Sequence, residues 1–130
     1  MSNLLWPSRR RRTVGILCAA LWVAALVATH LPPQDVPNIH ASDKVLHGIG
    51  YFVLSCALWL VLRTRGVGGA LRVLGTLAVL MLYAGFDEIT QPLFDRSAEW
   101  GDWNTDCLGA ALAIIVCELV LKLRSRGKPA

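Results

Sequence analysis

Side chains that could do chemistry gather in three short segments of this 130-residue chain. The first segment begins at Asp43 and Lys44 and continues to His47. Asp43 and His47 lie four residues apart, so the two side chains share one face of a helix. A carboxylate one turn before an imidazole can hold the ring in place for acid–base chemistry. The alternative is that Asp43 only caps the helix and His47 rests in an interface.

The second segment places Glu88 and Gln91 three residues apart, again on one helix face, with Asp87 pointing elsewhere. Both acids follow directly on an apolar run. A carboxylate so close to an apolar run is costly to expose to lipid, and it should therefore be paired or line a cavity. The alternative is that Glu88 simply reaches bulk water. We favour a functional role for this carboxylate.

The third segment runs from Arg96 to Gly109 and contains Asp102 and Asp106. Asp102, Asp106 and Gly109 fall at positions i, i+4 and i+7, which form a single stripe along a helix. Asp102 can be a helix N-cap, but Asp106 lies a full turn deeper, where capping does not explain it. Gly109 allows another backbone to approach closely. Because half-buried carboxylates need partners, we predict that Arg96 forms an ion pair with Asp102 or Glu88.

Four apolar runs must position these segments. The chain is 55% hydrophobic and only 17% charged, and a membrane span needs about 17–25 residues. We predict an all-α membrane protein with four transmembrane helices at residues 14–31, 45–62, 71–91 and 103–121. The third helix must continue past Asp87 and Glu88 until Pro92 stops it, because its uncharged part is too short to cross a bilayer. A cleaved signal peptide is the alternative for the first run, which exceeds the usual length of such an apolar region.

The distribution of charge predicts the orientation of these helices. Eleven of the 13 Lys and Arg residues lie near the N-terminus, in the connection between the second and third helices, or near the C-terminus. Short segments rich in Lys and Arg stay in the cytoplasm, so both termini are predicted to be cytoplasmic. Eight of the nine acidic residues fall on the opposite, outer side. The chain thus divides into a basic cytoplasmic arm (residues 1–13), a transmembrane domain (14–121) and a basic cytoplasmic tail (122–130).

Packing inside the bundle can also be predicted from residue type. Ala20, Ala24 and Ala28 recur every fourth residue and form a small-residue face suited to close packing of another helix. Glu118 lies four residues before Lys122, and we expect the two to form an ion pair near the helix end. The four cysteines show no C-x-x-C spacing, and we predict that they are apolar packing residues rather than a disulfide framework or a zinc site.

Taken in order, the three segments resemble the VanZ-like family of small bacterial membrane proteins. The resemblance covers the chain from Ser42 to the end of the fourth helix, and most members carry Asn where this chain has Asp106. The family takes its name from a factor linked to resistance to teicoplanin-type glycopeptide antibiotics. The resemblance implies a multi-pass protein of the bacterial plasma (inner) membrane that acts at the cell envelope. It rests on Asp43-Lys44 with His47, on Asp87-Glu88 with Gln91, and on Arg96 followed by Asp102, Asp106 and Gly109.

We interpret the three segments as an outward-facing polar pocket that binds a lipid-linked or cell-wall-related molecule, with glycopeptide resistance as the phenotype that the family implies. The first alternative is an intramembrane enzyme acting on a phosphorylated lipid head group, with His47 as the acid/base. The second is a purely structural membrane protein whose polar residues fasten the helices. No catalytic residue is assigned, because the chain has no recognised catalytic motif. The candidate outer polar site comprises Asp43, Lys44, His47, Glu88, Gln91, Arg96, Asp102 and Asp106, with Gly109 for close helix packing.

Cofactors and partners are predicted from the same residue types. We expect no cofactor and no metal, because one histidine with several acids is a poor set of zinc ligands. We expect no nucleic-acid partner, because the basic residues are spread in clusters between long uncharged runs and no recognition motif accompanies them. The lipid bilayer is the predicted partner, and the sequence assigns no protein partner.

Overall fold

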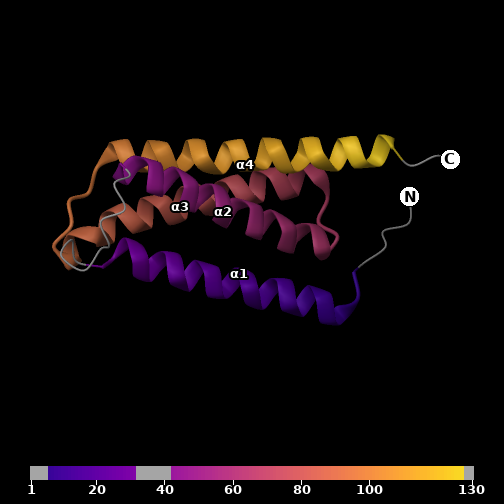
Figure 1. Cartoon of the computed structure of the whole chain (residues 1–130), viewed down its shortest axis with the longest axis horizontal. Helices are drawn as coiled ribbons and strands as arrows, with labels where there is room; N and C mark the ends of the chain where they lie inside the picture. The colour runs from indigo at the N-terminus through magenta and orange to yellow at the C-terminus, as the bar shows by residue number, and fades with distance from the viewer. Residues whose placement is uncertain (1–5, 32–41, 128–130) are drawn as a thin grey trace.

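Four α-helices run along the long axis of the molecule (Figure 1). The structure is a computed structural model, and it describes residues 6–31 and 42–127. No strand occurs in these described ranges, so the predicted all-α class is confirmed. The outermost parts of the predicted arm and tail, residues 1–5 and 128–130, lie outside them. The elements are α1 (Ser8–Thr29), α2 (Asp43–Thr64), α3 (Gly69–Thr90), the 3₁₀ helix η2 (Gln91–Phe94) and α4 (Trp100–Arg126).

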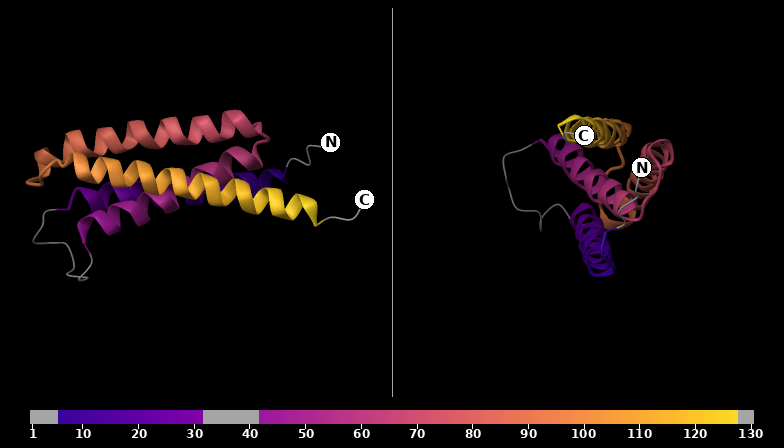
Figure 2. Two further views of the ribbon diagram at one scale, coloured as in Figure 1. Left: turned by 90° about the horizontal axis from the view of Figure 1, so that it is seen from above. Right: turned by 90° about the vertical axis from the view of Figure 1, so that its right-hand side faces the viewer.

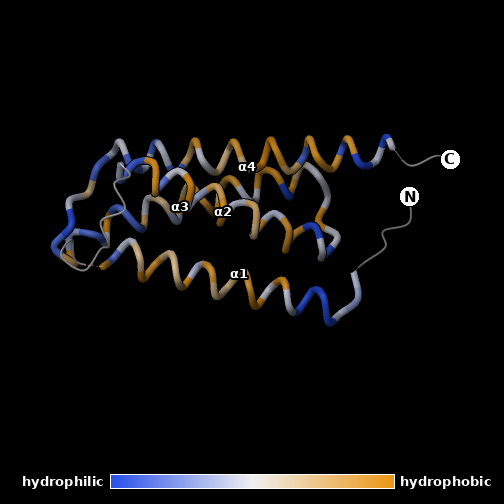
Figure 3. Tube along the Cα trace, viewed as in Figure 1, coloured by the Kyte–Doolittle hydropathy of each residue, from blue (hydrophilic) through white to orange (hydrophobic). Residues whose placement is uncertain are grey.

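Among the described residues, three helices are long and apolar enough to cross a membrane: α1, α2, and α3 continued by η2. The 22 residues of α1 or α2 reach about 33 Å at about 1.5 Å per residue, slightly more than a bilayer core of about 30 Å. α4 is longer, with 27 residues, but is not among the three; Asp106 and Glu118 interrupt its apolar sequence. Hydrophobic residues occupy the middle of the bundle and hydrophilic ones gather toward its two ends (Figure 3).

The helix ends differ from the predicted spans. α1 begins at Ser8 rather than at residue 14, because the basic residues Arg9–Arg12 are good helix formers and extend the helix beyond its apolar part. For the same reason α4 continues to Arg126. α3 continues past the two acids at 87 and 88, as predicted, and ends at Thr90, just before the turn that contains Pro92.

The core of the bundle lies where α2, α3 and α4 meet. α2 lies between α1 and α4 (Figures 1 and 2). Each core side chain is at most 2% exposed. The core cluster consists of Tyr51 and Leu54 from α2, Leu80 and Ala84 from α3, and Ala110 from α4.

α1 is the least buried helix and contributes no fully buried residue. Ala20, Ala24 and Ala28 are exposed, so the prediction that this face packs closely against another helix was wrong for the described part of the chain. α1 instead turns Trp22 toward the core, where its ring lies 4.6 Å from the ring of Tyr83, centroid to centroid. The indole sets the rotation of α1 because it buries far more area than an alanine side chain.

Two glycines allow α2 and α4 to cross closely. A Cβ atom added at Gly109 would overlap the carbonyl oxygen of Gly48 and would lie 3.1 Å from its carbonyl carbon and 3.2 Å from its Cα. The atoms in the way belong to the backbone of α2, which no rotamer change can move. The crossing therefore depends on the missing side chain at Gly109.

A partly buried ion pair stabilises the end of the bundle where α2 ends and α3 begins. Nη2 and Nε of Arg72 donate to Oε1 of Glu118 at 2.6 and 2.9 Å, and the indole N–H of Trp59 donates to the same oxygen at 2.8 Å. The predicted pair of Glu118 with Lys122 was wrong. Lys122 is exposed whereas Arg72 is 7% exposed, and a buried cation needs a carboxylate partner more than an exposed one does.

The cysteines fit the apolar packing role predicted for them. All four are free and partly buried. Two of them meet across the α2–α4 contact, where Sγ of Cys117 lies 3.6 Å from Sγ of Cys56.

Candidate functional site

Polar residues are buried at the end of the bundle where α2 and α4 begin and α3 ends, on the left in Figure 1. We call it the acidic end, because seven acids there face only Lys44 and Arg96 among the described residues. Burial of so many ionisable groups in an apolar bundle is costly unless each finds a partner. Six polar side chains at this end are at most 6% exposed: His47, Asp87, Glu88, Gln91, Asp102 and Asp106.

His47 and Asp106 form the centre of the acidic end. Nδ1 of His47 on α2 lies 3.2 Å from Oδ1 and 3.3 Å from Oδ2 of Asp106 on α4. The sequence predicts that Asp43 holds the imidazole of His47, but in the structure it is Asp106 that contacts the ring. Asp43 and His47 do share a face of α2, but Asp43 is exposed at the first turn while His47 turns inward against α4.

Glu88 completes a buried triad with this pair. His47, Glu88 and Asp106 each offer one ligand atom, and these atoms all lie within 4.8 Å of one another. Oε2 of Glu88 accepts the backbone N–H of Glu99 at 2.8 Å, which ties the end of α3 to the residue that precedes α4. Oε1 of Glu88 is buried without a hydrogen-bond partner in the part of the chain that the structure describes. The alternative that Glu88 reaches bulk water does not hold, because its side chain is enclosed.

Two basic residues form ion pairs with the acids of the acidic end. Nη2 of Arg96 lies 3.2 Å from Oδ2 of Asp43, so the predicted pairing of Arg96 with Asp102 or Glu88 was wrong. Asp102 is taken by Lys44, whose Nζ lies 3.2 Å from Oδ1 of Asp102 and 2.9 Å from Oε2 of Glu99. Lys44 is near enough to cover Asp102 because α2 and α4 cross closely, and this leaves Arg96 for Asp43.

A second polar network ties α1 to α3, and Gln91 is the one member of it that the sequence placed in the candidate site, there with Glu88 rather than with Asp87. Oγ1 of Thr29 donates to Oδ1 of Asp87 at 2.7 Å, and Nδ1 of His30 lies 3.6 Å from the same oxygen. Nε2 of His30 lies 2.8 Å from Oγ1 of Thr90, and Nε2 of Gln91 donates to Oδ2 of Asp87 at 3.5 Å. The signal that could have indicated it is the adjacent pair Thr29-His30 at the end of an otherwise apolar run.

A cavity of about 310 Å³ opens between α1 and α2 beside this end. Its polar wall is formed by Asp43, His47, Tyr51 and Arg96, and its apolar wall includes Leu54. The structure thus brings His47 and Arg96 to one cavity. Glu88 and Asp106 lie beside His47, and Asp102 forms an ion pair with Lys44. The hydroxyl of Tyr51 is buried without a partner in the described residues.

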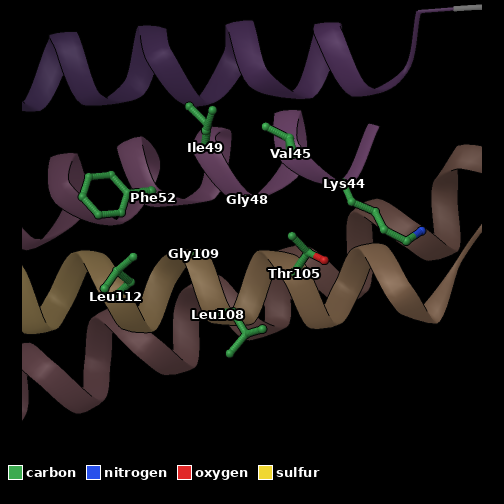
Figure 4. Close-up of a pocket in the computed structure, with 9 residues that line it drawn as sticks. All are labelled: Lys44, Val45, Gly48, Ile49, Phe52, Thr105, Leu108, Gly109 and Leu112. Atoms are coloured by element: carbon green, nitrogen blue, oxygen red, sulfur yellow. The ribbon is translucent and has the colours of Figure 1, made fainter. Parts of the chain in front are cut away.

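A second, more open groove of about 390 Å³ follows the crossing of α2 and α4 (Figure 4). Lys44 lies at one end of it and Leu112 at the other, with Gly48 and Gly109 facing each other between them (Figure 4). Apart from Lys44 and Thr105, its lining is apolar or glycine. The groove therefore offers little that could specify a polar ligand, and the cavity beside His47 is the better candidate site.

One comparison with known protein families gives a match. The model of the VanZ/LLP1 family matches residues 22–121, from the middle of α1 to near the end of α4. This range contains every residue of the acidic end and of the cavity beside it. No curated protein and no solved structure matches the chain.

Proposed function

Because the chain belongs to the VanZ/LLP1 family, we propose that it is a membrane protein of the bacterial cell envelope whose acidic end binds a lipid-linked or cell-wall-related molecule. The observation that carries the proposal is the cavity between α1 and α2. The side chains of His47 and Tyr51 and the ion pair of Arg96 with Asp43 form its polar part. The apolar faces of two helices form the rest. A concave site with a few convergent polar groups on an apolar wall suits an amphiphilic ligand.

The position of the ion pair suggests how such a ligand is oriented. Arg96 and Asp43 form the polar mouth of the cavity, and the side chain of Asp43 is 56% exposed. The planar guanidinium of Arg96 can exchange this carboxylate for a phosphate or carboxylate of the ligand. The apolar part of the ligand then lies along Ala28 and Leu54, and His47 lines the same cavity.

Four spans and an outward-facing acidic end are part of this proposal. We expect Ser97→Cys, in the connection before α4, to react with a membrane-impermeant maleimide added to intact cells in a background without the native cysteines. Gly68→Cys, between α2 and α3, should react only after the cells are opened. The reason is the placement of Lys and Arg, which hold their segments in the cytoplasm. Labelling of Gly68→Cys in intact cells would refute this orientation.

A variant that fills the cavity tests the binding proposal. Gly50 lines the cavity, and a Cβ atom added there meets nothing within 4 Å, so we expect the side chain of Gly50→Leu to occupy the cavity. We expect it to weaken photolabelling of the purified protein by a photoreactive polyprenyl phosphate by at least about tenfold, which corresponds to about 1.4 kcal/mol of lost contacts. In cells, teicoplanin sensitivity is the phenotype to compare with the parent chain.

Gly75→Leu is the matched control. Gly75 lies on α3, also meets nothing within 4 Å, and does not line the cavity, so the same exchange of residue types should leave labelling unchanged. A photoreactive polyprenol without phosphate shows whether the polar mouth contributes. Equal labelling of the parent chain and Gly50→Leu would exclude this cavity as the binding site.

The contact between His47 and Asp106 favours a second candidate, an intramembrane enzyme acting on a phosphorylated lipid head group. An imidazole held by a buried carboxylate is a common acid/base arrangement. Incubation of the purified protein with a polyprenyl diphosphate separates the two functions. Release of inorganic phosphate that is lost in His47→Gln supports the enzyme, whereas labelling without release supports the binding protein.

A further inference from the structure

One buried carboxylate oxygen at the acidic end has no donor among the described residues. Glu88 is 6% exposed, and its Oε1 is buried without a hydrogen-bond partner among residues 6–31 and 42–127, although Oε2 accepts a backbone N–H. The hydroxyl of Tyr51, one helical turn after His47, is likewise buried without a partner in the described ranges. A buried, ionised oxygen without a donor or a cation is strongly unfavourable. While Glu88 is ionised, a donor or a cation from outside the described protein atoms would satisfy this oxygen.

The neighbours of Glu88 do not supply the missing positive charge. The imidazole of His47 faces Asp106, so the two carboxylates of the triad share one histidine. Lys44 is held by Glu99 and Asp102, and Arg96 is held by Asp43. Both described basic side chains of the acidic end are thus already paired. The negative charge that lacks a cationic partner is therefore located where Glu88 and Asp106 approach each other.

We propose that His47, Glu88 and Asp106 bind a divalent metal ion. Donor atoms bound to one ion at about 2.1 Å are about 3.0–3.4 Å apart. The three donor atoms here lie within 4.8 Å of one another on three different helices, so side-chain adjustments of about an ångström bring them to one ion. The ion supplies the partner that Oε1 of Glu88 lacks.

The donor set indicates which ions fit. Two carboxylates are hard ligands that suit Mn²⁺ as well as Mg²⁺, whereas the imidazole favours a first-row transition metal over Mg²⁺ or Ca²⁺. One histidine with several acids is a poor set of zinc ligands. One imidazole and two carboxylates enclosed between three helices suit Mn²⁺ or a similar ion. Of the three donor residues, His47 also lines the cavity between α1 and α2.

Mn²⁺ binding by the full chain in a neutral detergent tests the inference. After treatment with a chelator and removal of the chelator, we expect the protein to take up one Mn²⁺ per chain, measured as loss of the free-ion electron paramagnetic resonance signal. Zn²⁺ should displace the Mn²⁺, and Mg²⁺ in excess should not. Glu88→Gln and Asp106→Asn should each weaken binding at least about tenfold, because loss of even an indirect metal contact costs about 10–100-fold in affinity.

Asp95→Asn is the matched control. Asp95 is an exposed acid at the same end, outside the triad, so the substitution removes the same charge without removing a donor atom. Equal weakening by Asp95→Asn and Glu88→Gln would show that Mn²⁺ only collects at a negative surface and would overturn the inference. Absence of stoichiometric Mn²⁺ binding by the parent chain would also overturn it, whether or not the variants fold.

A second measurement does not require the variants. Mn²⁺ bound to His47 should show a nitrogen coupling from one imidazole in pulsed electron paramagnetic resonance, and it should raise the melting temperature because it binds the folded state. A bound ion without nitrogen coupling would place it elsewhere and contradict the inference. Neither measurement contains a lipid ligand, so failure of the metal site leaves the proposed pocket standing, and failure of the pocket leaves the metal site standing.

Discussion

Gly109→Ala is expected to destabilise the protein by about 3 kcal/mol, at the upper end of the range for overpacked sites. The new methyl group would overlap the backbone of Gly48, whose carbonyl carbon and Cα lie 3.1 and 3.2 Å from its position. Because no side-chain rotation relieves this overlap, α2 and α4 must move apart. Their separation would loosen the contact between His47 and Asp106, which spans the same two helices. Thermal unfolding of the purified protein in detergent measures the effect.

Two other glycines give a graded control for this prediction. A Cβ atom added at Gly48 meets Cγ2 of Thr105 at 3.0 Å, a side-chain atom that can shift, so Gly48→Ala should cost less than Gly109→Ala. A Cβ atom at Gly75 meets nothing within 4 Å, so Gly75→Ala should be neutral or stabilise the helix by about 0.5–1 kcal/mol. If Gly109→Ala unfolds at the same temperature as Gly75→Ala, the helices do not cross as closely as described here.

The helices could be predicted from the sequence because long apolar runs are a strong signal. Their ends could not. Arg9–Arg12 and Arg126 extend α1 and α4 beyond the apolar runs, since helix formation depends on backbone hydrogen bonds and propensity, whereas the prediction followed where charge begins. The end of α3 was predicted better, because Pro92 marks a point where the backbone cannot continue the helix.

The membership of the polar cluster was also predictable in part. Three polar segments that follow or precede antiparallel apolar helices at the same end of the bundle lie close together there. The partner of each side chain could not be predicted, because it depends on how each helix is rotated about its axis. That rotation is set by contacts between distant residues: Gly48 with Gly109 for α2 and α4, and Trp22 with Tyr83 for α1.

Two wrong predictions follow from not knowing how each helix is rotated about its axis. Arg96 was assigned to Asp102 or Glu88 on charge alone, and the structure pairs it with Asp43. Asp87 was set aside because it points away from Glu88, yet this direction brings it to Thr29 on α1. Both contacts join residues more than fifty positions apart, where local spacing carries no information.

Arg72→Leu is expected to have the other large effect, at the opposite end of the bundle. Arg72 is 7% exposed, donates twice to one oxygen of Glu118, and places its guanidinium carbon 4.9 Å from the ring centroid of Trp59. Removing one partner of a buried ion pair costs about 3–5 kcal/mol. We expect the lower part of that range, because the side chain of Glu118 is 31% exposed and water can partly replace the lost donor.

A double substitution tests whether the cost comes from the unpaired carboxylate. Glu118→Gln keeps an oxygen that accepts the indole N–H of Trp59 but removes the charge. In the double variant Arg72→Leu with Glu118→Gln, no buried charge is left without a partner, so we expect most of the lost stability to return. Arg65→Leu removes an exposed arginine at the same end and should change the free energy of unfolding by no more than about 0.5 kcal/mol. Melting in detergent compares all four proteins with the parent chain. A double variant as unstable as Arg72→Leu alone would mean that the packing of the arginine side chain, and not its charge, holds α3 against α4.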